Sequence, residues 1–175
     1  MSLLTRIGSM GSSVLLFVSI FGVTGPLVVH TPSVPEGLYW RIPVDAEGLR
    51  EGAYVCLPSW STFAPSVLRD GVMRGDLPAE WKDEVLVKRV AAVAGELVDY
   101  REGEGVVIRG QVLPTSVALP ATTAGRAMPR PRFPYRVRTG EVWLAATHPR
   151  GYDSRYMGAV DVRALSCIAR PTWLW

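Results

Sequence analysis

The chain is poor in cysteine, and this shortage limits the metal and redox chemistry that it could carry. Cys56 and Cys167 are its only cysteines, and they form no CxxC pair and have no nearby histidine ligands. A zinc site is therefore not expected. In an oxidising compartment the two thiols could join in one disulfide, but the sequence does not show that their Cα atoms approach within bonding distance. Two separate, buried small side chains are the alternative.

Blocks of basic residues and cofactor motifs are also lacking. The net charge of +3 comes largely from dispersed arginines, so nucleic acid is not an expected partner. Gly103 and Gly105 resemble part of a phosphate-binding loop, but the third glycine and the following helix are missing. No metal and no cofactor are therefore expected.

Long soluble helices are not expected either, because 14 prolines and 17 glycines interrupt the chain. Short apolar runs between turn residues instead predict an all-β body, and the 175 residues suit one domain plus an anchor. The region 58–82 is expected to be a surface loop with at most one short helix, and 114–138 an insertion or mobile loop. The expected strands cover residues 38–44, 53–57, 84–96, 98–109 (as a hairpin), 141–145 and 165–169.

Charge is absent near the N-terminus, where an uncharged stretch over residues 9–30 is about long enough to cross a bilayer. Arg6 before it predicts a cytoplasmic N-terminus. A cleavable signal peptide is the competing interpretation, but residues 27–30 are bulky and offer no small-x-small cleavage site. We therefore predict an uncleaved membrane anchor over residues 1–30 and one domain over residues 31–175.

A serine lies between two prolines directly after this stretch, in the sequence HTPSVPEGLY over residues 30–39. Proline restricts its own φ and biases the preceding residue towards extended conformations. Ser33 should therefore be presented on a rigid, extended segment just outside the membrane. Taken alone, the same segment is more simply interpreted as a linker between anchor and domain.

The most apolar run outside the anchor, residues 84–96, carries two adjacent cations, Lys88 and Arg89. Neighbours in a strand point to opposite faces, so one of the two must point inward if one face packs on a core. An edge strand protected by charges is the alternative. Lys88 is flanked by apolar residues, whereas the chain's other lysine, Lys82, lies in a polar stretch.

Two catalytic schemes fit a serine displayed in this way. A Ser-His-Asp triad would use His30 or His148 as base and Asp153 to orient it, but no GxSxG elbow surrounds Ser33 and His30 lies at the membrane edge. A Ser-Lys pair needs a lysine whose pKa is lowered by an apolar site, because an ordinary lysine is almost fully protonated near neutral pH. Ser33 with Lys88 is the better supported pair.

Three short motifs resemble the conserved boxes of type I signal peptidases. Residues 31–35 (TPSVP) resemble the nucleophile box, residues 88–96 (KRVAAVAGE) the lysine box, and residues 153–155 (DSR) the end of the last box. Their order behind an apolar N-terminal segment also fits that family. The variants PSVPEGLY and YDSRYMG look most like the TraF-like, conjugative-transfer subgroup.

This resemblance implies a transmembrane helix followed by a signal-peptidase-like antiparallel β domain, anchored in the bacterial inner membrane and facing the periplasm. It implies a serine endopeptidase that cuts a conjugative pilin precursor, with hydrolysis or ring closure as the outcome and other transfer proteins as partners. A general leader peptidase and a non-catalytic, membrane-anchored component of a transfer or secretion channel are the alternatives. LexA-type repressors share the Ser-Lys chemistry but carry a DNA-binding helix pair in place of the apolar segment.

The resemblance also assigns roles at the reacting centre. Ser33 would be the nucleophile and Lys88 the general base. The backbone N–H of Ser33, together with the Thr31 hydroxyl, would stabilise the oxyanion.

The last motif should support the lysine. Asp153 would order the region around Lys88, and Arg155 would pair with Asp153. Relatives of this family have a serine two residues before that aspartate to orient the lysine, whereas this chain has Gly151. Ser154 or a water molecule is the expected substitute.

Overall fold

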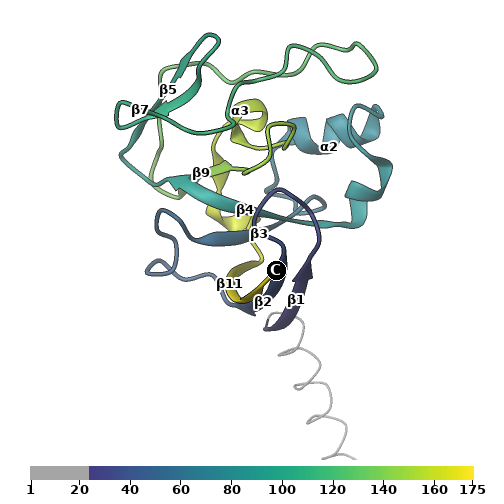
Figure 1. The fold of residues 1–175 in the computed structure, drawn as a ribbon, viewed down its shortest axis with the longest axis vertical. Coiled ribbons are helices and arrows are strands. Elements are labelled where there is room, and N and C mark those ends of the chain that lie inside the picture. The colour runs from purple at the N-terminus through teal and green to yellow at the C-terminus, as the bar shows by residue number, and fades with distance from the viewer. Residues whose placement is uncertain (1–23) are drawn as a thin grey trace, which may run out of the picture.

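Antiparallel strands build the framework of the described residues, 24–175, in this computed structural model (Figure 1). One sheet has seven strands in the order β1-β2-β11-β3-β4-β9-β10, and the other has four in the order β7-β6-β5-β8. All pairings are antiparallel, which confirms the predicted mainly β architecture. The first sheet contains β1 (Gly25–Val29), β2 (Gly37–Ile42), β3 (Tyr54–Pro58), β4 (Val85–Ala92), β9 (Glu141–Ala145), β10 (Val160–Asp161) and β11 (Cys167–Leu174). The second contains β5 (Leu97–Arg101), β6 (Gly105–Ile108), β7 (Gln111–Val112) and β8 (Tyr135–Arg136).

The helices are short. The region 58–82, predicted to hold at most one helix, leads into two, because Pro65 and Pro78 each turn the chain into a helix directly after them. Among residues 24–175, none of the helices has the length and apolar character needed to cross a membrane. The helical elements are α2 (Ser66–Met73), η1 (Ala79–Asp83), α3 (Ser154–Met157) and η2 (Val162–Ala164).

Strand β1 corrects the outer boundary predicted for the anchor. Pro26 lies opposite Trp40 and Val28 opposite Leu38 in its pairing with β2, so residues 25–29 form a strand and do not end a helix. The physical reason is that a proline is accepted in an edge strand, and a short apolar run can take either conformation until its pairing partner is known. The rest of the predicted anchor, residues 1–23, lies outside the described residues.

The two cysteines form a disulfide between β3 and β11. Cys56 and Cys167 lie directly opposite each other in the register of these strands, with their Cα atoms 5.0 Å apart. Both side chains are buried in an apolar cluster that also contains Val34 and Val87. The disulfide thus links the last strand to the centre of the sheet, across a sequence separation of 111 residues.

The region 114–138 is largely irregular, as predicted for an inserted loop. Besides β8 at its end, it contains an isolated bridge between Ala121 and Ala127. Its first part is nevertheless tied to the body, since the Leu119 N–H donates to the Tyr156 hydroxyl at 2.9 Å. This attachment places residues 115–119 close to helix α3.

Candidate active site

Ser33 and Lys88 meet although 55 residues separate them in the sequence. Lys88 Nζ donates a hydrogen bond to Ser33 Oγ at 2.8 Å. Lys88 is 1% exposed, whereas its neighbour Arg89 is only partly buried. The prediction that one of the two cations points inward is confirmed, and that cation is Lys88.

The strand pairing explains why Lys88 is buried. It lies on the same face of β4 as Leu86 and Val90, and it pairs across to Val55 of β3. These three apolar side chains belong to the largest core cluster. Lys88 therefore approaches Ser33 from inside the core, and no water shell stabilises its charged form.

Burial lowers the pKa of Lys88 from 10.5 to about 8, with a smaller opposing effect of the nearby Asp153 carboxylate and a further lowering by Arg155. Within residues 24–175, Ser33 Oγ is the only hydrogen-bond partner of Nζ. An amine with this pKa is neutral in an appreciable fraction of molecules just above neutral pH, so it can accept the serine proton.

Ser33 does not lie on an extended segment as predicted. Residues 31–34 form a turn between β1 and β2. A proline at the second position of a turn has its φ already set, which favours this conformation at Pro32. Val34, 1% exposed, anchors the end of the turn in the core and leaves Ser33 facing a cavity.

This cavity has a volume of about 350 Å³ and lies between the Ser33 turn, the start of β4 and residues 148–151. Thr31 lines it beside Ser33. Among the described residues, neither the Ser33 N–H nor the Thr31 hydroxyl has a hydrogen-bond acceptor, so both can donate to an incoming carbonyl oxygen.

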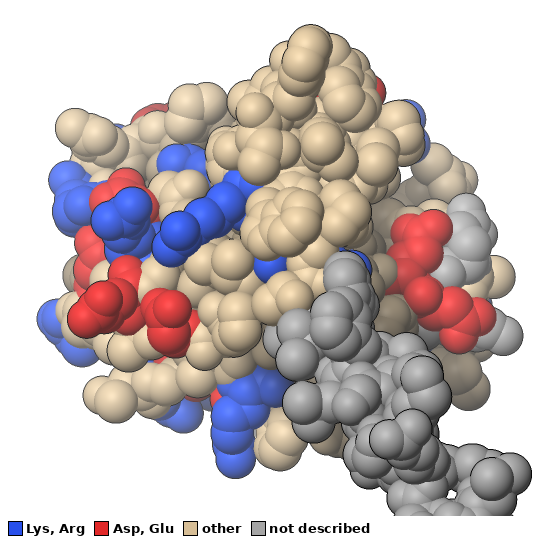
Figure 2. Space-filling model, turned by 90° about the horizontal axis from the view of Figure 1, so that it is seen from below, with Lys and Arg blue, Asp and Glu red and all other residues tan. Residues whose placement is uncertain are grey.

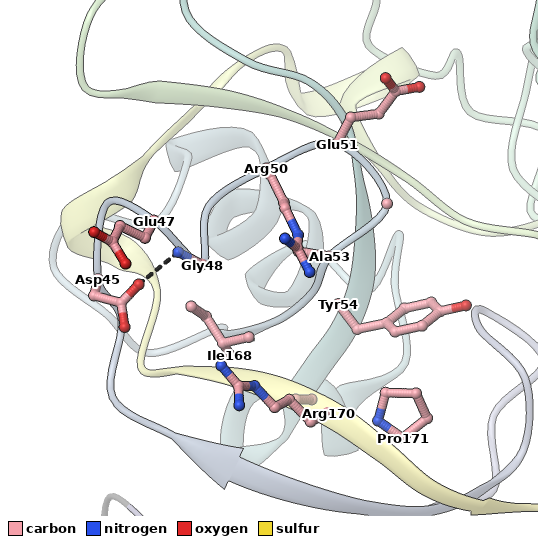
Figure 3. Close-up of a pocket in the computed structure, with 12 residues that line it drawn as sticks. Asp45, Glu47, Gly48, Arg50, Glu51, Ala53, Tyr54, Ile168, Arg170 and Pro171 are labelled. Carbon is pink, nitrogen blue, oxygen red and sulfur yellow. Dashed lines mark hydrogen bonds between the residues drawn. The ribbon is translucent and has the colours of Figure 1, made fainter.

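A second, larger cavity of about 500 Å³ lies between residues 45–54 and strand β11. Figure 3 shows Arg50 and Arg170 projecting towards it, while Asp45 accepts a hydrogen bond from the Gly48 N–H. Serine, threonine and cysteine are absent from its described lining residues. It therefore offers no hydroxyl or thiol of these three types paired with a buried base, and the smaller cavity at Ser33 is the candidate active site.

Asp153 and Arg155 form a buried ion pair, and each residue is 2% exposed. Asp153 Oδ1 accepts from the Arg155 N–H at 3.0 Å and from Nε at 2.8 Å. Asp153 Oδ2 accepts from Arg155 Nη2 at 2.7 Å and from the Ala146 N–H at 2.8 Å. The predicted partnership of these two residues is present, and Asp153 acts on Lys88 through its charge and not through a hydrogen bond.

The third nitrogen of the Arg155 guanidinium, Nη1, binds two loops, one after β7 and one after β9. Nη1 donates to the backbone oxygens of Thr115 at 2.7 Å, Pro149 at 3.1 Å and Val117 at 3.3 Å. One guanidinium thus connects Asp153, the start of the 114–138 region and the segment after β9.

Ser154 does not orient Lys88, which corrects that part of the prediction. It is fully buried, and its Oγ accepts a hydrogen bond from the Leu144 N–H at 2.8 Å. A side chain at Gly151 would also not fit, because its Cβ would lie 2.3 Å from the Ala146 Cβ. This close packing explains why glycine replaces the serine expected at that position.

The histidines do not build a triad with Ser33. His148 lines the cavity, but its Nδ1 accepts from the Arg150 N–H at 3.1 Å. His30 packs near Trp175, with ring centroids 5.9 Å apart. Since both oxygens of Asp153 are occupied by Arg155 and Ala146, the alternative Ser-His-Asp arrangement is absent from the described residues.

Sequence reasoning missed Thr147. Its N–H donates to the Ser33 carbonyl at 2.8 Å, and its Oγ1 donates to the Pro32 carbonyl at 2.9 Å. No local pattern could have indicated this contact, because 114 or 115 residues separate the partners.

The family model and the most similar named relatives indicate one family. A family model described as signal peptidase, peptidase S26, matches residues 13–174. The plasmid transfer protein TraF of Escherichia coli is 31% identical over 169 residues, covering 94% of this chain and 92% of that protein. The conjugal transfer protein TraF of Agrobacterium fabrum (strain C58 / ATCC 33970) is 31% identical over 158 residues, covering 89% of this chain and 86% of that protein. A solved signal peptidase I from Enterococcus faecalis V583 is 18% identical and covers 68% of this chain and 94% of its own, with a TM-score of 0.38.

Proposed function

The chain belongs to the signal peptidase S26 family as a TraF-like member, and on that premise we propose that it is a membrane-anchored serine endopeptidase that processes a conjugative pilin precursor. The observation that carries the proposal is the hydrogen bond of 2.8 Å between Lys88 Nζ and Ser33 Oγ, with the lysine buried in apolar surroundings. A structural component of a transfer channel gains nothing from a lysine buried beside a serine.

The geometry supports nucleophilic catalysis by Ser33. Neutral Lys88 takes the proton of Ser33 Oγ as this oxygen attacks the carbonyl carbon of the scissile peptide bond. The Ser33 N–H and the Thr31 hydroxyl donate to the oxyanion that forms. When the C–N bond breaks, the Lys88 ammonium returns its proton to the leaving amine, and an ester on Ser33 remains.

The ester on Ser33 can be resolved in two ways. A water molecule or an amine attacks the ester carbonyl, and Lys88 accepts a proton from the attacking group. When the C–O bond to Ser33 breaks, Lys88 gives this proton to Ser33 Oγ and both side chains return to their starting state. Water gives a carboxylate and therefore a linear product. The amino terminus of the same chain gives a new peptide bond and therefore a ring.

The activity should depend on pH through Lys88. Because burial lowers the pKa of Lys88 to about 8, the fraction of neutral lysine falls about tenfold for each pH unit below that value. We expect kcat/KM for cleavage to rise with pH up to about 8 and then to level off. A rate profile between pH 5.5 and 9.5 on a purified precursor measures this, and a flat profile from pH 6 to 8 would argue against Lys88 as the base.

The membrane setting of this proposal is supported by an apolar face on β1, β2 and β11. Val28, Trp40 and Trp173 are 51%, 48% and 71% exposed, respectively. Val28 and Trp173 each lie opposite Leu38 in the strand pairing. Leu38 and Trp40 are two residues apart on β2 and therefore point to the same side, so Val28, Trp40 and Trp173 share one face of the sheet. Figure 2 views the end of the molecule where these strands lie, and uncharged residues fill most of its centre.

Exposed tryptophans beside an apolar segment are typical of the membrane–water interface. We place the domain on the periplasmic side of the inner membrane, with Ser33 nine residues beyond Thr24 and so within roughly 30 Å of it along the chain. Fractionation of host cells tests this placement. The protein should stay with the inner membrane, and added protease should digest the domain only after the outer membrane is removed.

The processing activity itself is tested by co-expressing a conjugative pilin precursor with this enzyme and weighing the products by mass spectrometry. A product lighter than the corresponding linear fragment by one water would indicate ring closure, and a linear fragment would indicate hydrolysis. The Ser33→Ala variant is the control, since it should leave the precursor intact. Cleavage that persists with Ser33→Ala would contradict the proposal, and cleavage of many unrelated secreted proteins would point to a general leader peptidase.

A further inference from the structure

We infer that Thr147 is a positioning residue that orients Ser33 for both nucleophilic attack and oxyanion binding; the inference rests on the proposed function. Thr147 lies two residues after Ala145, the last residue of β9. It contacts the backbone of the Ser33 turn and not the Ser33 side chain. It belongs to none of the three motifs that resemble the family boxes.

The contacts of Thr147 hold both peptide groups that flank the Ser33 Cα. Its Oγ1 donates to the Pro32 carbonyl at 2.9 Å, and its N–H donates to the Ser33 carbonyl at 2.8 Å. Two fixed peptide planes determine the direction of the bond from Cα to Cβ, and the hydrogen bond from Lys88 Nζ then selects the χ1 rotamer that places Oγ. Thr147 therefore fixes the nucleophile through the main chain.

The same hydroxyl also aims an oxyanion donor. The Pro32 carbonyl and the Ser33 N–H belong to one trans peptide group, in which the C=O and N–H bonds point in opposite directions. Because Thr147 Oγ1 holds the carbonyl on one side, the N–H must point to the other side. That N–H is one of the two groups free to donate to a substrate oxygen.

Thr147 is itself held from two sides. Its carbonyl accepts from Thr115 Oγ1 at 3.0 Å, and the N–H of the preceding residue, Ala146, donates to Asp153 Oδ2 at 2.8 Å. The Thr115 carbonyl in turn accepts from Arg155 Nη1 at 2.7 Å. The buried Asp153–Arg155 pair thus reaches the nucleophile through Thr147, without a hydrogen bond to Lys88.

The Ser33–Lys88 pair depends on this support, because Lys88 Nζ has no hydrogen-bond partner other than Ser33 Oγ within residues 24–175. The turn is otherwise anchored by Val34, which packs in the core on the far side of Ser33. Without the Thr147 hydroxyl, the Pro32–Ser33 peptide group can rotate about its flanking bonds. Ser33 Oγ and its N–H would then leave their productive directions together.

Thr147→Val tests the inference, since it keeps the backbone N–H and the shape of the side chain but removes the hydroxyl. We expect kcat for precursor cleavage to fall by about 10- to 100-fold with KM changed less than about threefold, somewhat less than the loss when an oxyanion donor is deleted outright. The midpoint of the pH profile should stay near 8, because the burial of Lys88 is unchanged.

Thr147→Ser is the matched control, because serine retains the hydroxyl, and it should keep kcat within about threefold of wild type. Equal kcat for Thr147→Val and wild type would overturn the inference, as would an equal loss in both variants. The melting temperature of each variant separates misorientation from unfolding. Failure of the wild type to cleave in a Ser33-dependent manner would instead count against the proposed function itself.

Discussion

Replacing Ser33 by alanine or Lys88 by methionine should abolish precursor cleavage, with kcat reduced by a factor on the order of 10⁴ or more. The first change removes the attacking oxygen, and the second removes the hydrogen-bonded base 2.8 Å from it. Lys88→Arg should be equally inactive, because a guanidinium does not lose its proton to act as a base. Single-turnover cleavage of purified precursor, followed by mass spectrometry, measures these losses.

The free energy of unfolding shows whether an inactive variant has lost only its catalytic group or also its fold. The folded-state pKa of Lys88, about 8, lies below its usual value of 10.5, so the unfolded chain binds the lysine proton more tightly than the folded protein does. Stability is therefore lost as the pH falls from about 10.5 to 8, and the whole loss is present at pH 7. Lys88→Met removes this loss, which amounts to about 3 kcal/mol. An inactive variant that unfolds more easily than wild type at pH 7 would not support the proposed role of Lys88, whereas substantial cleavage by any Lys88 variant would exclude it.

Replacing Arg155 by methionine should give the largest loss of stability, about 3–5 kcal/mol in the free energy of unfolding. The change leaves the Asp153 carboxylate buried without its ionic partner and removes the three donors that Arg155 Nη1, Nε and Nη2 supply. Denaturation by urea, monitored by circular dichroism, measures the loss. Cleavage should weaken as well, because Thr115 and Thr147 lose their support.

The chain offers a matched control for this change. Asp161 and Arg163 repeat the Asp-x-Arg spacing, and both aspartates accept a hydrogen bond from the N–H of their arginine at the start of a helix. The second pair is exposed to solvent, with 65% of the Arg163 side chain accessible. Arg163→Met should therefore leave the free energy of unfolding nearly unchanged, because exposed ion pairs contribute little. Similar effects of the two substitutions would refute the importance assigned to burial.

The pairing of Ser33 with Lys88 could be predicted from sequence because its chemistry is restrictive. A serine nucleophile needs a base, and of the two lysines only Lys88 lies in an apolar run. Strand alternation then required one of two adjacent cations to point inward. These are local properties, and the structure agrees with them.

The remaining features depend on which segments become neighbours in space. β1 could not be distinguished from the end of an apolar helix, because its pairing with β2 decides its conformation. The prediction that Ser154 orients Lys88 is wrong, because Ser154 Oγ accepts from the Leu144 N–H. Leu144 lies on β9, outside the motif that contains Ser154. Thr147 and the Cys56–Cys167 disulfide likewise depend on register between distant strands. Such register is set by the completed sheet and not by the residues next to each site.

The position of β11 has a consequence for when the enzyme can become active. The last strand of the chain inserts between β2, which follows the nucleophile turn, and β3, which pairs with the strand of the base. Until β11 has taken its place, Ser33 and Lys88 lie on two parts of the sheet that no strand yet connects, β1-β2 and β3-β4. If the proposed function and export hold, we expect no cleavage of other proteins, or of the chain itself, before β11 has joined the sheet. Formation of the Cys56–Cys167 bond, which needs β11 in place, would mark the moment of completion and can be followed by thiol alkylation during export.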